Sequence, residues 1–320
     1  MMINNNLEKV GNTPLVKLET GIKNLDLYTK LELYNPTGSV KDRAASYILD
    51  KKLAMGKINK DSTVIESSSG NFGVALAAYC KMKKLKFIAV VDPCIAPFNE
   101  MLIKSFGARV IKVTEPDQNG GYLLHRIQKV KELLHEIEHS YWVNQYANPY
   151  NADAYYHSLG NEICDSFDTL DYVFMGISSG GTITGVSRKV KERFPKAQII
   201  AVDIVGSVIF GHPAKKRYIP GIGSSMVPKI LKLAKIDDVV MMDEITTINM
   251  CHELLKNHYI LAGGSSGSCY GAVLKYFADK KIEKPLNVVT LFADRGERYA
   301  TTIYDEQWCS QFVTAHSNGK

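Results

Sequence analysis

The chain has 320 residues, enough for one large or two medium domains with a sizeable buried core. Hydrophobic residues make up 45% and charged residues 22% of it, which argues against a disordered, collagen-like or coiled-coil protein. Lysine and arginine outnumber aspartate and glutamate by 39 to 33, and they are scattered along the chain. We therefore expect only a weak preference for anionic small molecules and no nucleic-acid partner.

The first thirty residues and the cysteines indicate the cellular compartment of the protein. Polar and charged residues at positions 4–6, 8 and 9 interrupt any signal-peptide-like region, and no apolar run is long enough to span a membrane. The six cysteines never occur at C-x-x-C spacing, and several lie in apolar helical patterns. We expect a cytoplasmic protein with no metal site and no membrane partner.

Short apolar runs rich in β-formers alternate with helical patterns, which is typical of a parallel sheet with crossover helices. The pattern predicts strands at residues 63–66, 87–91, 110–113, 141–144, 172–175, 199–203, 239–242 and 288–292. It predicts helices at residues 40–55, 72–82, 98–106, 122–137, 152–167, 181–194, 246–257 and 269–278. These strands are many for one sheet, and residues 144–151 are rich in turn formers, so we expect an α/β protein with two doubly wound parallel-sheet lobes.

Residues 35–43, with the sequence Asn-Pro-Thr-Gly-Ser-Val-Lys-Asp-Arg, run from a turn into a helix. Ser39 is the expected N-cap, and Lys41 falls in the first turn. The positive end of the helix dipole disfavours an ammonium, so we expect a lowered pKa and an amine that acts as a nucleophile or forms a Schiff base. Taken alone, the segment also fits a solvated lysine beside Asp42.

Two further turns lead from a predicted strand into a helix. Residues 67–73 read Ser-Ser-Ser-Gly-Asn-Phe-Gly, and residues 178–182 read Ser-Ser-Gly-Gly-Thr. Backbone N–H groups and small hydroxyls at a helix start favour a carboxylate or a phosphate, and the loops beyond parallel strands are where such folds bind ligands. Neither turn matches a Walker loop or a dinucleotide-binding fingerprint, and each also fits an ordinary capped helix.

Residues 263–267, Gly-Gly-Ser-Ser-Gly, match the nucleophile elbow of serine hydrolases, with Ser265 at the nucleophile position. A serine hydrolase is therefore an alternative function. Its triad would need a histidine further along the chain, and the sequence offers only His316, within the polar tail at 315–320. We expect that tail to fray, which makes it a poor place for a general base.

Six motifs occur in one order: Gly11–Leu15, the Lys41 turn, the Ser-Gly-Asn loop, the Gly-Gly-Thr turn, Pro220–Gly223 and the Gly-Ser-Ser-Gly turn. Over nearly its whole length the chain resembles the cysteine synthase family of pyridoxal-phosphate enzymes, which have the fold type II architecture of the tryptophan synthase β subunit. The resemblance implies a smaller N-terminal lobe at residues 35–145. It also implies a larger lobe, formed by residues 1–34 and 146–320, that binds the cofactor phosphate.

By this resemblance the cofactor is pyridoxal 5′-phosphate and Lys41 is its Schiff-base lysine. Asn71 is implied as the partner of the phenolic oxygen, and Ser265 as the partner of the pyridine nitrogen, where a hydroxyl suits a neutral ring. The implied phosphate cradle consists of Ser178, Ser179, Gly180, Gly181 and Thr182. The implied clamp for the amino-acid carboxylate consists of Ser68, Ser69, Asn71 and Gln145.

The sequence also departs from plain cysteine synthases. Arg295 stands where the family has serine, and residues 115–123, 141–148 and 206–211 resemble the siderophore branch, in which O-phosphoserine is joined to glutamate on the way to 2,3-diaminopropionate. Glutamate adds carboxylates to the site, so added cations are expected, with Arg295 the first candidate and Arg298 the second. Arg217, just before the Pro220 motif, is expected to bind the leaving phosphate.

The resemblance therefore implies a β-replacement enzyme with small amino-acid substrates that is a homodimer, as in the family, and we expect it in the cytoplasm. Lys41 would be displaced from the cofactor by O-phosphoserine and remove the Cα proton, so that phosphate leaves as an aminoacrylate forms. The glutamate amine would then add at Cβ. A cysteine synthase that uses O-acetylserine or O-phosphoserine with sulfide is the alternative within the family. Outside it, a serine hydrolase and a non-catalytic pyridoxal-phosphate sensor stay open.

Overall fold

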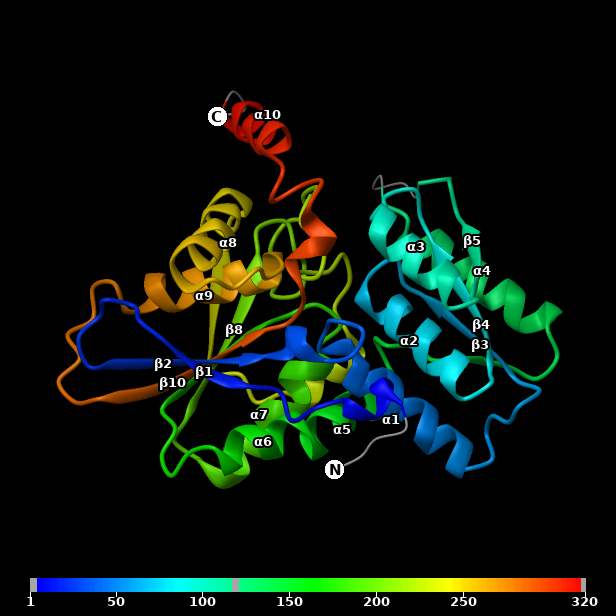
Figure 1. The fold of residues 1–320 in the computed structure, drawn as a ribbon, viewed down its shortest axis with the longest axis horizontal. Coiled ribbons are helices and arrows are strands. Elements are labelled where there is room, and N and C mark those ends of the chain that lie inside the picture. Colours follow the sequence, from blue (N-terminus) through cyan, green and yellow to red (C-terminus); the bar gives the residue numbers. More distant parts are fainter. Residues whose placement is uncertain (1–4, 117–120, 318–320) are drawn as a thin grey trace.

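The structure is a computed structural model that describes residues 5–116 and 121–317. Two sheets lie side by side with helices packed on them (Figure 1). The six-stranded sheet has the order β1 (Leu15–Leu18), β2 (Leu25–Leu31), β10 (Leu286–Phe292), β7 (Tyr172–Gly176), β8 (Gln198–Ile204) and β9 (Asp238–Met242). The four-stranded sheet has the order β5 (Arg109–Lys112), β4 (Lys86–Val91), β3 (Thr63–Ser67) and β6 (Ser140–Trp142). The expected α/β class is confirmed, although β1 is antiparallel to β2 at the edge of the larger sheet.

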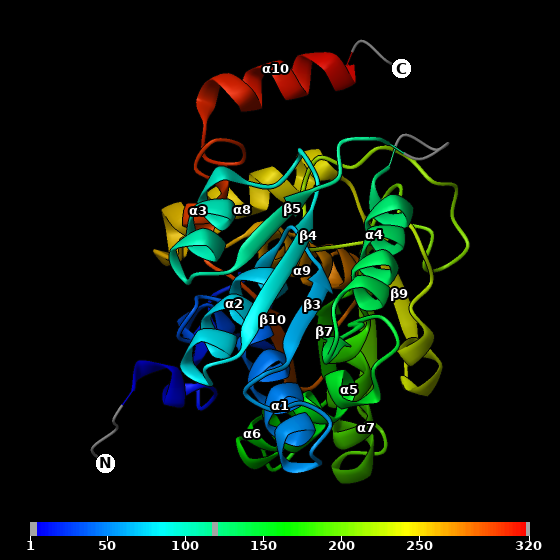
Figure 2. The same cartoon turned by 90° about the vertical axis from the view of Figure 1, so that its right-hand side faces the viewer.

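Helices cover both faces of the larger sheet, with α8 and α9 on one face and α5 to α7 on the other (Figure 1). In the smaller sheet α2 and α4 lie on opposite faces (Figure 2). The α-helices are α1 (Lys41–Ala54), α2 (Asn71–Met82), α3 (Pro97–Ser105), α4 (Leu123–Glu136), α5 (Pro149–His157), α6 (Leu159–Asp165), α7 (Gly181–Arg193), α8 (Glu244–His258), α9 (Gly264–Phe277) and α10 (Glu306–Ser317). The 3₁₀ turns are η1 (Asn6–Lys9), η2 (Glu32–Tyr34), η3 (Lys229–Leu233) and η4 (Gly296–Tyr299).

Several elements differ from the sequence-based expectation. The strands β1 and β2 were not predicted, because β2 contains charged residues such as Lys30, which is only 4% exposed in the fold. The helix expected at 152–167 breaks at Ser158 into α5 and α6, and the helix expected at 269–278 begins earlier, at Gly264. Residues 315–317, expected in a frayed tail, belong to α10, whereas residues 117–120 and 318–320 lie outside the described residues.

One continuous hydrophobic core joins the two sheets. It runs from Val64 on the smaller sheet through Ile48 of α1 and Tyr155 of α5 to Val173 on the larger sheet. The smaller sheet is formed entirely by strands between residues 63 and 142, which supports our proposal of lobes at 35–145 and at 1–34 with 146–320. Within the described part of the chain, no helix is long and apolar enough to cross a membrane.

A buried cluster of ion pairs fixes the start of α1 to the larger sheet. Arg43 Nε lies 2.7 Å from Glu32 Oε2, and its Nη1 lies 2.6 Å from Glu162 Oε1. Lys30 Nζ lies 2.8 Å from the other Glu162 oxygen. Burial opposes ionisation of Glu162, but Arg43 and Lys30 lower its pKa to about 2. Because Arg43 follows Lys41 by two residues, the cluster holds the lysine turn in place.

We expect Glu32→Gln to lower the free energy of unfolding by about 3 kcal/mol, because it leaves the buried Arg43 guanidinium with one carboxylate fewer. Urea unfolding at pH 7 measures the change. The control is Asp26→Asn, which breaks a pair with Lys17 whose side chains are 37% and 50% exposed. That variant should lose less than about 1 kcal/mol. Equal losses in the two variants would contradict a special role of the buried cluster.

Candidate active site

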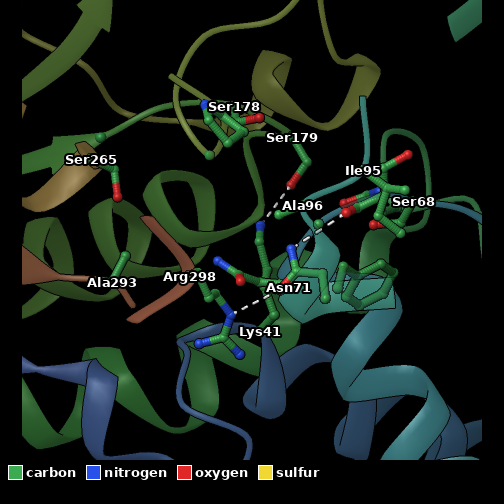
Figure 3. Close-up of a pocket in the computed structure, with 18 of the residues that line it drawn as sticks. Lys41, Ser68, Asn71, Ile95, Ala96, Ser178, Ser179, Ser265, Ala293 and Arg298 are labelled. Carbon is green, nitrogen blue, oxygen red and sulfur yellow. Dashed lines mark hydrogen bonds between the residues drawn. The ribbon is translucent and has the colours of Figure 1, made fainter. Parts of the chain in front are cut away.

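A cavity of about 650 Å³ lies between the lobes, at the carboxyl ends of β3, β7 and β10 (Figure 3). The first turns of α1, α2, α7 and α9 all contribute to its wall, so the positive ends of several helix dipoles meet there. The residues predicted from the sequence that line it are Lys41, Ser68, Ser69, Asn71, Gln145, Ser178, Ser179, Gly180, Gly181, Thr182 and Ser265.

Lys41 is the first residue of α1 and extends into the cavity (Figure 3). The helix starts one residue later than expected, so Val40 is the N-cap, and Ser39 Oγ accepts the Lys41 backbone N–H at 3.3 Å. The Lys41 Nζ lies 3.3 Å from Ser179 Oγ. Burial lowers the pKa of the amine to about 8, and the Asp294 carboxylate opposes this shift. The expected direction is therefore found, and its main cause is lost hydration.

The two serine-glycine turns carry backbone groups into the cavity. Ser68 Oγ accepts the Gly73 N–H at 3.1 Å, and a Cβ on Gly73 would lie 2.5 Å from the Ser68 carbonyl oxygen. Gly180 has a left-handed φ of +81°, and a Cβ on Gly181 would lie 2.3 Å from Asn151 Oδ1. Both turns therefore need glycine. The first N–H groups of a helix lack intrahelical acceptors, so the turn before α7 can hold a phosphate.

Ser265 lies in the first turn of α9, is 6% exposed and lines the cavity. Its hydroxyl is therefore presented by a rigid helix and not by the sharp loop of a nucleophile elbow. None of the described residues that line the cavity is a histidine. Among the described residues Ser265 thus has no cavity histidine for a Ser-His triad, and the serine hydrolase interpretation loses its structural basis.

Arg126 is a cavity residue that the sequence did not reveal. Its Nη1 donates to Ser69 Oγ at 2.9 Å and lies 3.1 Å from Asp92 Oδ2. Its Nε is buried and has no hydrogen-bond acceptor among the described groups. An unsatisfied N–H on a buried guanidinium is costly, so an anionic ligand at this wall would be stabilised. In the sequence Arg126 is one of many polar residues on α4, and only the packing of that helix shows that it faces the cavity.

Glu66 is a further residue that the sequence did not reveal; it does not line the cavity but is buried at the end of β3, next to the serine loop. Its carboxylate accepts the Ser67 backbone N–H at 2.7 Å, the Gln145 backbone N–H at 3.2 Å and the Trp142 indole N–H at 3.3 Å. Burial raises the pKa of Glu66 to about 7 in spite of these donors. The carboxylate thereby ties the loop that carries Ser68 to the backbone of Gln145.

The structure does not bring Arg217 or Arg295 to the cavity. Arg217 Nη1 donates to the Gly206 and Ser224 carbonyl oxygens at 2.9 and 3.0 Å, so its guanidinium fastens the loop in which it lies. Arg295 is exposed, and its Nε donates to the Leu33 carbonyl oxygen at 2.9 Å. Neither position agrees with the substrate contacts expected from the sequence, because both guanidinium groups bind backbone outside the cavity.

Arg298, the second candidate cation, does line the cavity and is 6% exposed. Its Nε donates to Asn99 Oδ1 at 3.2 Å, and its other nitrogens donate to the Gly38 and Thr37 carbonyl oxygens at 3.2 and 2.6 Å. The guanidinium therefore binds the turn that precedes Lys41 by hydrogen bonds and connects that turn to α3 of the smaller lobe (Figure 3).

Comparison with known proteins places this site in a family. The family described as "Pyridoxal-phosphate dependent enzyme" matches residues 7–294. The chain belongs to this family. An N-(2-amino-2-carboxyethyl)-L-glutamate synthase of Cupriavidus metallidurans is 44% identical over 317 residues, which cover 98% of this chain and 93% of that protein.

Solved structures agree with this assignment. An O-acetylserine dependent cystathionine beta-synthase from Helicobacter pylori is 33% identical with a TM-score of 0.88, over 95% of this chain and 100% of that one. An O-ureido-L-serine synthase is 27% identical with a TM-score of 0.87, over 96% of each chain. The resemblance found in the sequence motifs is confirmed: the chain is a fold type II, pyridoxal-phosphate-dependent enzyme of the cysteine synthase family.

We expect Lys41 of the apoenzyme to react with an amine-specific reagent with a pH midpoint of about 8, because burial lowers its pKa and the neutral amine is the reactive form. Reductive methylation at a series of pH values, followed by peptide mass spectrometry, gives the midpoint. The enzyme loaded with cofactor is the control, since Lys41 is expected to be protected there. A midpoint near the ordinary lysine value of 10.5 would contradict the buried environment of the amine.

Proposed function

We propose that the enzyme catalyses a β-replacement that joins O-phospho-L-serine to L-glutamate, giving N-(2-amino-2-carboxyethyl)-L-glutamate and phosphate. The observation that carries this proposal is the Arg126 guanidinium on the cavity wall, whose buried Nε has no acceptor among the groups that the structure describes. A phosphate can accept from a guanidinium in bidentate fashion, whereas an acetyl ester brings no charge. The name of the 44% identical relative supports the same product.

The residues of the cavity fit the cofactor of the family. Bound pyridoxal 5′-phosphate supplies an electron sink for negative charge that develops at the substrate Cα. We assign its aldehyde to Lys41, its phosphate to the turn at 178–182, its phenolic oxygen to Asn71 and its pyridine nitrogen to Ser265. A hydroxyl at the ring nitrogen leaves the pyridine neutral. That suits an elimination, which needs a weaker sink than a long-lived carbanion does.

Lys41 is the base in this proposal. A pKa of about 8 leaves about a tenth of the amine neutral at pH 7, so it can take the Cα proton of O-phosphoserine and later return it. Ser68, Ser69 and Gln145 bind the substrate carboxylate at the start of α2. The bond from Cβ to the phosphate oxygen breaks and the glutamate nitrogen bonds to Cβ. That nitrogen gives up one proton, which leaves with the phosphate.

Charge in the cavity favours glutamate over sulfide as the second substrate. Besides Lys41, which holds the cofactor, the cations Arg126 and Arg298 line the cavity, and of these two only Arg126 forms an ion pair among the described residues, with Asp92. Such a site compensates the phosphate and the carboxylates of two amino acids, whereas sulfide needs no added cation. We further propose that the enzyme is cytoplasmic and forms a homodimer. Light scattering of the purified protein tests the dimer.

We expect the loaded enzyme to convert O-phosphoserine and glutamate into an adduct with the mass of N-(2-amino-2-carboxyethyl)-L-glutamate. Mass spectrometry of paired incubations, one with glutamate and one with sulfide, identifies the products. Omitting the enzyme controls for spontaneous addition. Efficient formation of cysteine with no glutamate adduct would overturn the proposal in favour of a cysteine synthase, and no turnover with either would favour a sensor.

We expect Arg126→Ala to lower kcat/KM for O-phosphoserine by about 10- to 100-fold, since a hydrogen bond to a charged group is worth about 1.5–3 kcal/mol. Arg126→Lys should retain part of the activity. Any activity with O-acetylserine should change much less. Arg217→Ala is the matched control, because that arginine lies outside the cavity and its loss should affect both substrates alike. Equal losses on both substrates in Arg126→Ala would remove it from the phosphate site.

A further inference from the structure

Asp294 is a buried carboxylate that the proposed reaction does not use. It lies just beyond β10 and is 1% exposed. Its Oδ2 accepts from Asn71 Nδ2 at 2.7 Å and from the Tyr299 hydroxyl at 2.8 Å. Its Oδ1 is buried with no hydrogen-bond partner among the described groups. A buried carboxylate with an unsatisfied oxygen destabilises the fold, so packing alone does not explain why an aspartate occupies this buried position.

The surrounding backbone fixes Asp294 beside the lysine turn. Its carbonyl oxygen accepts the Gly263 N–H at 2.9 Å, and a Cβ on Gly263 would lie 2.0 Å from Asp294 Oδ1, so the carboxylate requires glycine there. Asp294 also forms a β-bridge with Ser39, and the Val40 N–H donates to the Ala293 carbonyl oxygen at 2.8 Å. A shift of the carboxylate would therefore move the turn that carries Lys41.

Two cations from different elements interact with Asp294. The cations are Lys41 on α1 and Arg298 on η4. Burial raises the pKa of Asp294, and Arg298, Asn71, Tyr299 and Lys41 oppose that rise. The other titratable groups that interact with it are Tyr299, Tyr304 and Cys251. Two cations and two hydrogen-bond donors thus face one carboxylate and act against the effect of burial.

An ionised carboxylate only accepts hydrogen bonds. Asn71 turns its Nδ2 toward Asp294 Oδ2, an orientation in which the amide oxygen does not face the carboxylate. The second N–H of the same nitrogen then has a fixed direction on the cavity wall. A phenolic oxygen of the cofactor needs such a donor and would be repelled by the amide oxygen.

We propose that Asp294 is a positioning residue that fixes the Asn71 amide for the cofactor and holds the negative charge which partners the Lys41 ammonium in the empty site. The first part rests on the proposed contact between Asn71 and the phenolic oxygen. Neither part depends on which amino acids react, so a failure of the O-phosphoserine and glutamate assignment would leave it intact.

The test compares Asp294→Asn with Tyr299→Phe in the apoenzyme. Asparagine has the same shape without the charge, whereas Tyr299→Phe removes the other donor to Oδ2 and keeps the carboxylate. We expect Asp294→Asn to lower the pH midpoint of Lys41 methylation by about one unit, because it removes a negative charge that interacts with the amine, and to raise the Kd for pyridoxal 5′-phosphate about tenfold. Tyr299→Phe should leave the Lys41 midpoint within a few tenths of a unit.

Asn71→Ala, alone and combined with Asp294→Asn, forms a double-mutant cycle. The single variant Asn71→Ala stays informative if Asp294→Asn does not fold. It should raise the Kd for pyridoxal 5′-phosphate and leave the Lys41 midpoint unchanged, and adding Asp294→Asn to it should not raise the Kd much further. An unchanged cofactor Kd in Asn71→Ala would overturn the proposal, because no amide would then need positioning. An unchanged midpoint and Kd in a folded Asp294→Asn enzyme would overturn it as well.

Discussion

The loss of hydration around the Lys41 amine is the constraint on which the rest of the site depends. A lysine in water is protonated and inert, whereas burial brings the pKa of this one to about 8. The position is kept because both ends of the lysine turn are held. Arg298 binds the turn from the larger lobe, and the ion pairs of Arg43 with Glu32 and Glu162 hold the helix that follows. The catalytic amine is thus placed by interactions that do not touch the substrates.

Carboxylates on and behind the cavity wall offset the charge of its cations. Asp92 partners Arg126, and Asp294 interacts with Lys41 and Arg298, so each cation is partly compensated before a ligand arrives. Glu66 lies beneath the proposed carboxylate loop with a pKa of about 7, so part of it is neutral at neutral pH. That neutrality reduces the repulsion a substrate carboxylate would meet there. An anionic substrate therefore meets donors and cations on the cavity wall.

The sequence predicted those parts of the site that are specified locally. A glycine that a turn requires or a serine before a helix is readable from neighbouring residues, so the loops around Lys41, Asn71 and Ser179 could be located. The direction in which a guanidinium faces depends on how its element packs. Arg295 and Arg217 therefore looked like substrate ligands and turned out to bind backbone, while Arg126 looked like an ordinary polar position on α4. The strand β2 was not predicted from the sequence for a similar reason, because burial of Lys30 in a strand depends on its ion pair with Glu162.

The central claim is that Lys41, and no other lysine, holds the cofactor in the cavity between the lobes. Borohydride reduction of the loaded enzyme fixes the cofactor to the lysine that holds it, and peptide mapping by mass spectrometry then locates it. We expect one pyridoxyl group per chain, on the peptide that contains Lys41, and none in Lys41→Ala. A pyridoxyl group on any other lysine of the wild-type enzyme would contradict the account.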